Sequence, residues 1–209
     1  MTHKFRILLF ASFWMLIHTV AQGDSARPEF LKLPDAILLN QDGRPVDLEQ
    51  DLLHGRIVAI QFIYTRCTLV CPVLGYQFAS LQKALGERAG REVRLISISV
   101  DPLHDTPEKL AAWAERYGSG PGWTQLTGES TAIDAVLKAF EAFSPDVEDH
   151  SALLLIGDPD RGLWQRLNGT TPIDQIMNAI DRFNTGNPRK QTPPNNTRLD
   201  AQTRSDLRR

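Results

Sequence analysis

The apolar positions of the chain form a series of short runs that predict the strands of a β-sheet. Three of these runs are long enough, and rich enough in β-branched or other apolar residues, to be buried strands: residues 57–64, 93–100 and 152–156. Two further strand candidates are shorter: residues 123–126 and 163–167. Within residues 34–48, two apolar stretches flank an Asp42-Gly43 turn, which predicts an antiparallel hairpin.

Between these strands, apolar residues recur with helical spacing behind residues that typically start helices. Four helices are predicted: residues 72–85, 106–117, 131–143 and 171–183. Pro72 suits a first helical turn because its missing N–H leaves no bond unmade. Thr106 is the expected cap of the second helix, and Thr131 with Asp134 the capping pair of the third.

The alternation of strands and helices indicates an α/β fold. Strand–helix–strand units imply parallel crossovers, while the hairpin near the start and a late pair of strands add antiparallel neighbours. We therefore expect a central mixed β-sheet flanked by helices on both faces, with an N-terminal β-hairpin.

Composition and charge divide the chain into four segments. Residues 1–23 combine a basic start with an apolar run of about 15 residues, short of the ~20 that span a membrane, and then Ala21-Gln22-Gly23, which favours a cleaved export signal over a short N-terminal anchor. Residues 24–32 are a linker and residues 33–183 the folded domain. Residues 184–209 hold six basic and two acidic residues and almost no apolar ones, which predicts a disordered basic tail.

Charge also bears on the class of partner. Residues 24–183 contain 15 Lys and Arg against 23 Asp and Glu, a net charge of −8. This acidic domain has no basic stripe, which argues against nucleic-acid binding. Nothing in the pattern suggests an obligate assembly, so a monomer is expected.

The strongest local feature is the pair Cys67 and Cys71, which lies where a buried strand leads into a helix. Ligands bind at this edge of open α/β sheets, and the N-terminus of the helix, expected just after Cys71, should lower the pKa of both thiols. Two soft thiolates favour Cu(I) or zinc. Structural zinc usually takes four strong ligands, so a three-ligand, sulfur-rich site fits copper better. A small structural disulfide remains an alternative, although closing so short a loop gains little stability.

A third ligand has to come from a histidine. His54 lies beside a glycine in a predicted surface turn, and His104 follows the second long strand, where it is an accessory candidate. His150 directly precedes the strand at 152–156, and it faces the cysteines if the sheet follows a thioredoxin pattern. Asp149 or Glu148 could then orient its imidazole.

These features together resemble the Sco/SenC family of copper-binding, thioredoxin-like proteins. Three stretches carry the resemblance: residues 62–72 with Cys67-x-x-x-Cys71-Pro72, residues 98–108 with two aspartates around a proline, and residues 149–160 with Asp149-His150-Ser151. The likeness runs from about Leu33 to Phe183. It implies a thioredoxin-like fold and copper ligation by Cys67, Cys71 and His150, with the loop of residues 101–107 as structural support near the metal. The segment before His150 is shorter than in many relatives and acidic, a difference that concerns the partner rather than the metal site.

The resemblance also implies a function. Its members assemble the copper centre of cytochrome c oxidase, so we expect a metallochaperone that delivers one copper ion to an acceptor such as an oxidase subunit. Export to the periplasm is expected, with the apolar N-terminal segment as an alternative anchor. The rival function is enzymatic: a thiol–disulfide oxidoreductase that uses Cys67 and Cys71 as a redox pair, with a thiol-reducing partner.

Overall fold

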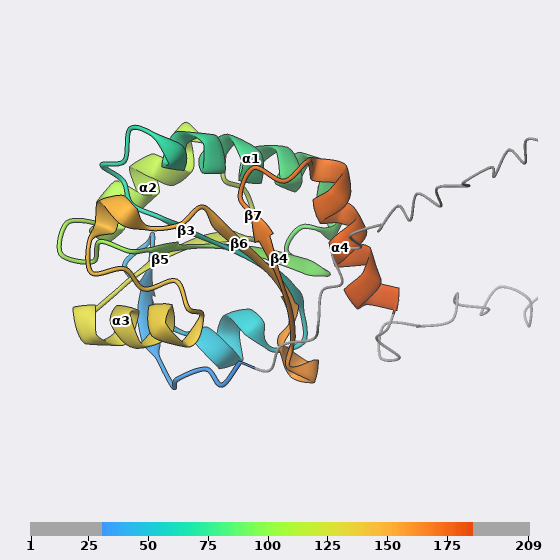
Figure 1. The fold of residues 1–209 in the computed structure, drawn as a ribbon, viewed down its shortest axis with the longest axis horizontal. Coiled ribbons are helices and arrows are strands. Elements are labelled where there is room, and N and C mark those ends of the chain that lie inside the picture. Colours follow the sequence, from blue (N-terminus) through green and yellow to red (C-terminus); the bar gives the residue numbers. More distant parts are fainter. Residues whose placement is uncertain (1–30, 186–209) are drawn as a thin grey trace, which may run out of the picture.

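The three long apolar runs form the centre of a seven-stranded mixed sheet in the computed structural model, which describes residues 31–185 (Figure 1). They are β3 (Ile57–Ile63), β4 (Val93–Ser99) and β6 (Leu153–Asp158). The remaining strands are β1 (Ile37–Asn40), β2 (Pro45–Asp47), β5 (Trp123–Thr127) and β7 (Leu163–Asn168). Their spatial order is β2-β1-β5-β4-β3-β6-β7.

Strand directions confirm the predicted mixture of crossovers and hairpins. Strand β3 is parallel to β4, which in turn is parallel to β5. On its other side β3 is antiparallel to β6, and the pairs β6–β7 and β1–β2 are antiparallel hairpins. Because β3 and β6 run in opposite directions, the residues that follow β3 lie at the same end of the sheet as those that precede β6.

Helices cover both faces of the sheet, as predicted (Figure 1). Three of them pack on one face: α1 (Val70–Leu85), α2 (Pro107–Arg116) and α4 (Ile173–Thr185). The other face is covered by α3 (Ser130–Ala139) and by η1 (Leu48–Leu53), a short π-helical segment that the sequence pattern did not predict. Alternate residues of β3 enter the two cores, which explains why the whole strand is buried and reads as a continuous apolar run.

Some helix boundaries differ from those that local capping residues predicted. The capping pair of Thr131 and Asp134 is wrong: α3 begins one residue earlier, behind Glu129, and it makes no side-chain capping bond. This helix also ends at Ala139 rather than at Phe143. Thr106 does occupy the cap position of α2, but its hydroxyl accepts no bond from the helix backbone.

The ends of the chain lie outside this description. The predicted export signal at residues 1–23 and the linker fall before or at its start, and nearly all of the predicted basic tail follows its end. Helix α4 continues two residues past the expected domain boundary, to Thr185. Within residues 31–185, no helix is long and apolar enough to cross a membrane.

Candidate metal centre

Helix α1 begins two residues earlier than its proline suggests, and this changes the setting of Cys71. The helix starts at Val70, so Cys71 lies inside its first turn, where a position just before the helix was expected. Its side chain is 1% exposed and packs in the core between α1 and the sheet. Pro72 remains in the first turn, as predicted, because an N–H at that level has no partner within the helix.

The sulfur of Cys67 takes the role that a hydroxyl or carboxylate usually has at the start of a helix. Leu69 occupies the cap position of α1 and offers no side-chain acceptor. The N–H of Cys71 instead donates to Cys67 Sγ, at 3.3 Å. Burial opposes a thiolate at Cys67, but hydrogen bonds from the N–H of Cys71 and from the Cys71 thiol outweigh it and lower the pKa of Cys67.

His150 reaches the same place from the start of the neighbouring strand, β6. It follows η3, a short 3-10 turn at Val147–Asp149, and precedes β6. Its Nε2 lies 3.6 Å from Cys71 Sγ, while its Nδ1 lies 2.9 Å from the backbone oxygen of Val147. The expectation that Asp149 or Glu148 orients the ring is therefore wrong in this structure, because a backbone carbonyl occupies that position.

The three side chains differ sharply in their electrostatics. Burial raises the pKa of Cys71 well above the ordinary thiol value, so the prediction of a lowered pKa holds for Cys67 and is wrong for Cys71. Burial also lowers the pKa of His150, which is 7% exposed. A neutral imidazole with its Nε2 directed at a thiol is a good donor to a soft metal ion.

Tyr64 contacts both Cys71 and His150, and the sequence analysis did not single it out. Its backbone N–H donates to Cys71 Sγ at 3.5 Å. Its ring meets the His150 ring edge to face, with centroids 5.2 Å apart. Burial, followed by the bond with Cys67, raises the pKa of Tyr64 to about 12. Its position three residues before Cys67 was the only signal in the sequence that could have found it.

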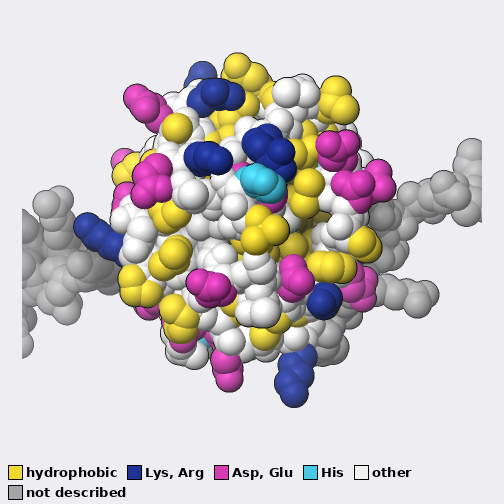
Figure 2. Space-filling model, turned by 90° about the vertical axis from the view of Figure 1, so that its left-hand side faces the viewer, with side chains coloured by type: hydrophobic (Ala, Val, Ile, Leu, Met, Phe, Trp, Pro, Cys, Tyr) yellow, Lys and Arg dark blue, Asp and Glu magenta, His cyan; other side chains and the backbone are white. Residues whose placement is uncertain are grey.

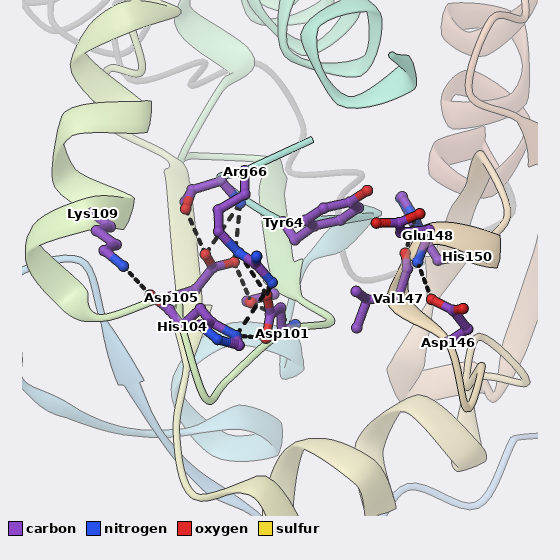
Figure 3. Close-up of polar contacts among 12 residues, drawn as sticks. Tyr64, Arg66, Asp101, His104, Asp105, Lys109, Asp146, Val147, Glu148 and His150 are labelled. Carbon is purple, nitrogen blue, oxygen red and sulfur yellow. Dashed lines mark hydrogen bonds and ion pairs between the residues drawn. The ribbon is translucent and has the colours of Figure 1, made fainter. Parts of the chain in front are cut away.

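Two buried aspartates of the loop after β4 hold the residues that lead to Cys67 (Figure 3). Asp105 is 1% exposed and accepts from the N–H and hydroxyl of Thr65 and from the hydroxyl of Ser99. Asp101 pairs with Arg66, with Nη2 and Oδ2 2.7 Å apart. This loop thus fixes the start of the cysteine loop, in line with the supporting role that the family resemblance implied for it.

His104, the accessory candidate, is occupied elsewhere. Its Nδ1 lies 2.7 Å from Asp101 Oδ1 and 3.3 Å from Arg66 Nη2. His54 lies beyond the opposite end of β3 and pairs with Asp160 at 2.8 Å, instead of standing free in solvent. Of the histidines in residues 31–185, only His150 is therefore brought to the cysteines.

A groove of about 330 Å³ opens over the cysteine loop at this end of the molecule. The cysteine loop and η3 form its walls, and Tyr64, Arg66, Cys67, Leu69, Glu148 and His150 are among its lining residues. Beside it, three exposed apolar side chains follow one another along α1: Leu69 at 85%, Val73 at 48% and Tyr76 at 65% exposure. Figure 2 looks onto the left-hand side of Figure 1, where hydrophobic side chains reach the surface among acidic and basic ones.

Both cysteines are free thiols in this structure. Among residues 31–185, no set of three or more His, Cys, Asp and Glu side chains is already arranged to hold a metal ion. The structure therefore brings the predicted ligands into one small region, and closing them around a single ion requires their side chains to adjust.

The fold and this site together define a class of protein: a thioredoxin-like domain that carries a thiol pair, joined by a histidine, at the end of its central strands. The family model described as SCO1/SenC matches residues 33–185, and the chain belongs to this family. The match spans nearly the whole described domain, and it confirms the resemblance that the sequence motifs indicated.

Relatives in sequence and structure agree with this assignment. The SCO1 protein homolog of Bacillus subtilis is 36% identical over 157 residues, which cover 70% of this chain and 79% of the relative. A structure of BsSco, described as a member of the Sco family of cytochrome c oxidase assembly proteins, is 31% identical with a TM-score of 0.66, covering 77% of this chain and 98% of that one. Bradyrhizobium japonicum ScoI, solved with copper bound, is 27% identical with a TM-score of 0.60, covering 71% and 96%.

Proposed function

We propose that this protein is a copper chaperone that binds one copper ion through Cys67, Cys71 and His150. The observation that carries the proposal is the approach of His150 Nε2 to within 3.6 Å of Cys71 Sγ, across 79 residues of sequence. Two thiols and an imidazole are the soft and borderline donors that favour copper. The copper-bound structure of the B. japonicum relative supports the same cargo.

Loading requires a small adjustment of donors that already lie close together. Cys71 and His150 are in contact, and the backbone N–H of Cys71 donates to Cys67 Sγ. Copper(I) replaces the thiol protons when it binds, so the low pKa of Cys67 favours it as the first ligand, with Cys71 and His150 following. Burial of the last two then protects the bound ion from water.

Release is expected to proceed in the reverse order, by stepwise exchange with thiols of an acceptor. Cys67 is partly exposed and lines the groove, so an incoming thiolate reaches the ion from its side. The exposed apolar side chains of Leu69, Val73 and Tyr76 beside the groove support docking of another protein there. We propose a copper-receiving subunit of cytochrome c oxidase as the acceptor, in line with the assembly role of the Bacillus relative.

The setting of this reaction follows from the same assignment. We propose that the chain is exported and acts as a monomer on the outer side of the cytoplasmic membrane. The signal-like composition of residues 1–23 supports export, and one structural relative, from Bacillus anthracis, is a lipoprotein of the same family (27% identical, TM-score 0.67, covering 76% of this chain and 98% of that one). N-terminal sequencing of the chain recovered from periplasm tests the expected cleavage before Asp24.

The proposal is tested by anaerobic titration of the reduced chain with Cu(I) in competition with a chromophoric chelator. Wild type is expected to take up one copper per chain, and Cys67→Ser and Cys71→Ser to lose at least 100-fold in affinity, because each removes a soft ligand (about 10–100-fold is typical even for changes outside the ligand set). Uptake far below one copper per chain, or wild-type affinity in both variants, would overturn the proposal. The matched control is Thr68→Ser, which alters the same loop and leaves the donors intact.

The second candidate function is a thiol–disulfide oxidoreductase, and the unequal thiols favour it. Cys67, with its lowered pKa and partial exposure, is suited to attack a partner disulfide and form a mixed disulfide. Cys71 then loses its proton and attacks Cys67 Sγ, releasing the partner as a dithiol while Cys67 and Cys71 become a disulfide. His150→Ala separates the two functions: it is expected to abolish tight copper binding and to leave most of the reduction of a small disulfide substrate intact.

A further inference from the structure

A single peptide group links Asp146 to the imidazole of His150. The carboxylate oxygen Oδ1 of Asp146 accepts from the backbone N–H of Glu148 at 2.9 Å. The carbonyl of Val147 belongs to the same peptide group as that N–H, and its oxygen lies 2.9 Å from Nδ1 of His150. Figure 3 draws both bonds. Asp146 and the ring of His150 therefore hold the two opposite ends of one peptide unit.

The planarity of the peptide bond makes this link rigid. The N–H and the C=O lie in one plane and point in opposite directions, so a bond that fixes the N–H also fixes the direction of the carbonyl. A carbonyl oxygen only accepts hydrogen bonds, so its bond with Nδ1 of His150 places a proton on Nδ1. In the neutral imidazole, Nε2 then carries the free lone pair, and Nε2 is the atom that lies 3.6 Å from Cys71 Sγ.

The turn that contains this peptide group depends strongly on its cap. It is η3, which has only three residues, and none of the three is buried. Apart from the Asp146 carboxylate, the turn is closed by a backbone bond from the N–H of Asp149 to the carbonyl of Asp146, at 3.1 Å. Asp146 has the extended backbone of a capping residue, and aspartate is among the residues that cap helices best.

We infer that Asp146 is a positioning residue for His150. Its carboxylate holds the peptide group between Val147 and Glu148, and the carbonyl of that group orients the imidazole with Nε2 toward Cys71. The inference rests on the proposed function, because it concerns one of the three proposed ligands. It adds the claim that the ring is oriented before copper arrives, and that a residue outside the ligand set orients it.

The first test observes the ring of His150 directly, by nitrogen NMR of the reduced, metal-free full chain at about pH 8, above the ordinary histidine pKa. Wild type is expected to show a protonated Nδ1 and an unprotonated Nε2. Asp146→Ala is expected to move both nitrogen shifts toward those of a mixture of tautomers, because the carbonyl is then free to turn away. Asp146→Ser retains a capping oxygen and is expected to keep the wild-type pattern.

The matched control is Asp47→Ala, which removes a cap of the same kind elsewhere in the fold. Asp47 caps η1 by accepting from the N–H of Gln50 at 2.9 Å. That short helix leads into the start of β3, at the end of the sheet opposite to His150. Asp47→Ala is therefore expected to leave the ring signals of His150 unchanged, which separates a general loss of stability from a loss of ring orientation.

Anaerobic Cu(I) competition then measures the consequence for binding. Asp146→Ala is expected to weaken binding about 5-fold, the typical effect of a lost helix cap on an equilibrium constant, while Asp146→Ser and Asp47→Ala stay within about 2-fold of wild type.

Three results would each overturn the inference: wild-type ring nitrogens in Asp146→Ala, a wild-type ring with its proton on Nε2, or equal losses of Cu(I) affinity in Asp146→Ala and Asp146→Ser. Failure of wild type to bind Cu(I) would instead overturn the proposed function. The metal-free spectra would still decide whether Asp146 orients the ring.

Discussion

The two ends of the β3–β6 pair each carry a histidine, but the two histidines have very different surroundings. At one end, His150 and Cys67 line a groove of about 330 Å³; at the other, His54, Glu49 and Asp160 line one of about 340 Å³. His54 has a side chain that is 65% exposed, and it pairs with the carboxylate of Asp160. His150 is 7% exposed, and its Nε2 faces a thiol.

Neither groove volume nor the presence of a histidine explains the difference between the ends. What distinguishes the end with the proposed metal site is burial: desolvation raises the pKa of Cys71 and lowers that of His150, which favours the uncharged form of both side chains. The opposite end offers one exposed imidazole that already pairs with the carboxylate of Asp160. We therefore attribute the proposed metal site to the burial of several donor side chains in one place.

Replacing each histidine separately with alanine is the most direct test of the difference between the two ends. His150→Ala removes a ligand and is expected to weaken Cu(I) binding at least about 100-fold, more than is lost when residues outside the ligand set are changed. His54→Ala is expected to leave it within about 2-fold, because its ring lies at the far end of the sheet. Chelator competition measures both, and equal losses in the two variants would refute the distinction between the ends.

The next prediction compares the two thiols at the end that carries the proposed metal site. In the reduced, metal-free protein, Cys67 is expected to react with iodoacetamide about 100-fold faster than Cys71 at pH 7.5, since thiolate is the reactive form. The pKa of Cys67 is lowered, so its rate levels off at a lower pH than that of an ordinary thiol, whereas the raised pKa of Cys71 keeps its rate rising into alkaline solution. Mass spectrometry of peptides separates the two, and equal rates would count against the asymmetry.

The aspartates at the two ends should differ in their contribution to stability. Asp105→Ala leaves three donors on Thr65 and Ser99 without their acceptor in a buried place, and it is expected to lower the free energy of unfolding by about 3 kcal/mol. Asp160→Ala, at the opposite end, removes bonds to the exposed Gly55 N–H and to His54, for about 1 kcal/mol. Urea unfolding at pH 7 measures both, and a larger loss in Asp160→Ala would contradict this ranking.

The smallest expected effect is a pH dependence of stability at the end that carries the proposed metal site. Asp101 is buried, which by itself raises its pKa, but hydrogen bonds from Arg66 and His104 prevail and lower it below the ordinary 3.8. Its carboxylate therefore stabilises the fold fully above that pH, and the contribution is lost as the pH falls through the lower pKa of the folded state. Asp101→Asn should cost about 1 kcal/mol at pH 6 and progressively less below pH 4. A cost that stays constant from pH 6 to pH 2 would contradict the assignment.

The sequence came close to the fold because the relevant patterns are local. The buried strands β3 and β4 appear directly as apolar runs, and the Asp42-Gly43 turn marks the hairpin β1–β2. Errors cluster at helix starts, such as those of α1 and α3, where one residue more or less of helix depends on contacts with distant strands. The π-helical turn at η1 gave no periodic signal because it is only six residues long.

Amino-acid order alone determined that two thiols stand at a strand–helix junction, and the family motif singled out His150 as their companion. Tertiary structure decided how these groups differ, since the pKa of a thiol or an imidazole depends on which atoms surround it rather than on its neighbours in sequence. Cys71 lies in the first turn of α1 because that helix starts early. Val147, and not an acidic residue, is the partner of His150, and the Tyr64 ring packs on His150 because β3 and β6 are paired. Desolvation is a property of the packed molecule, and so the chemistry of this site is completed by folding.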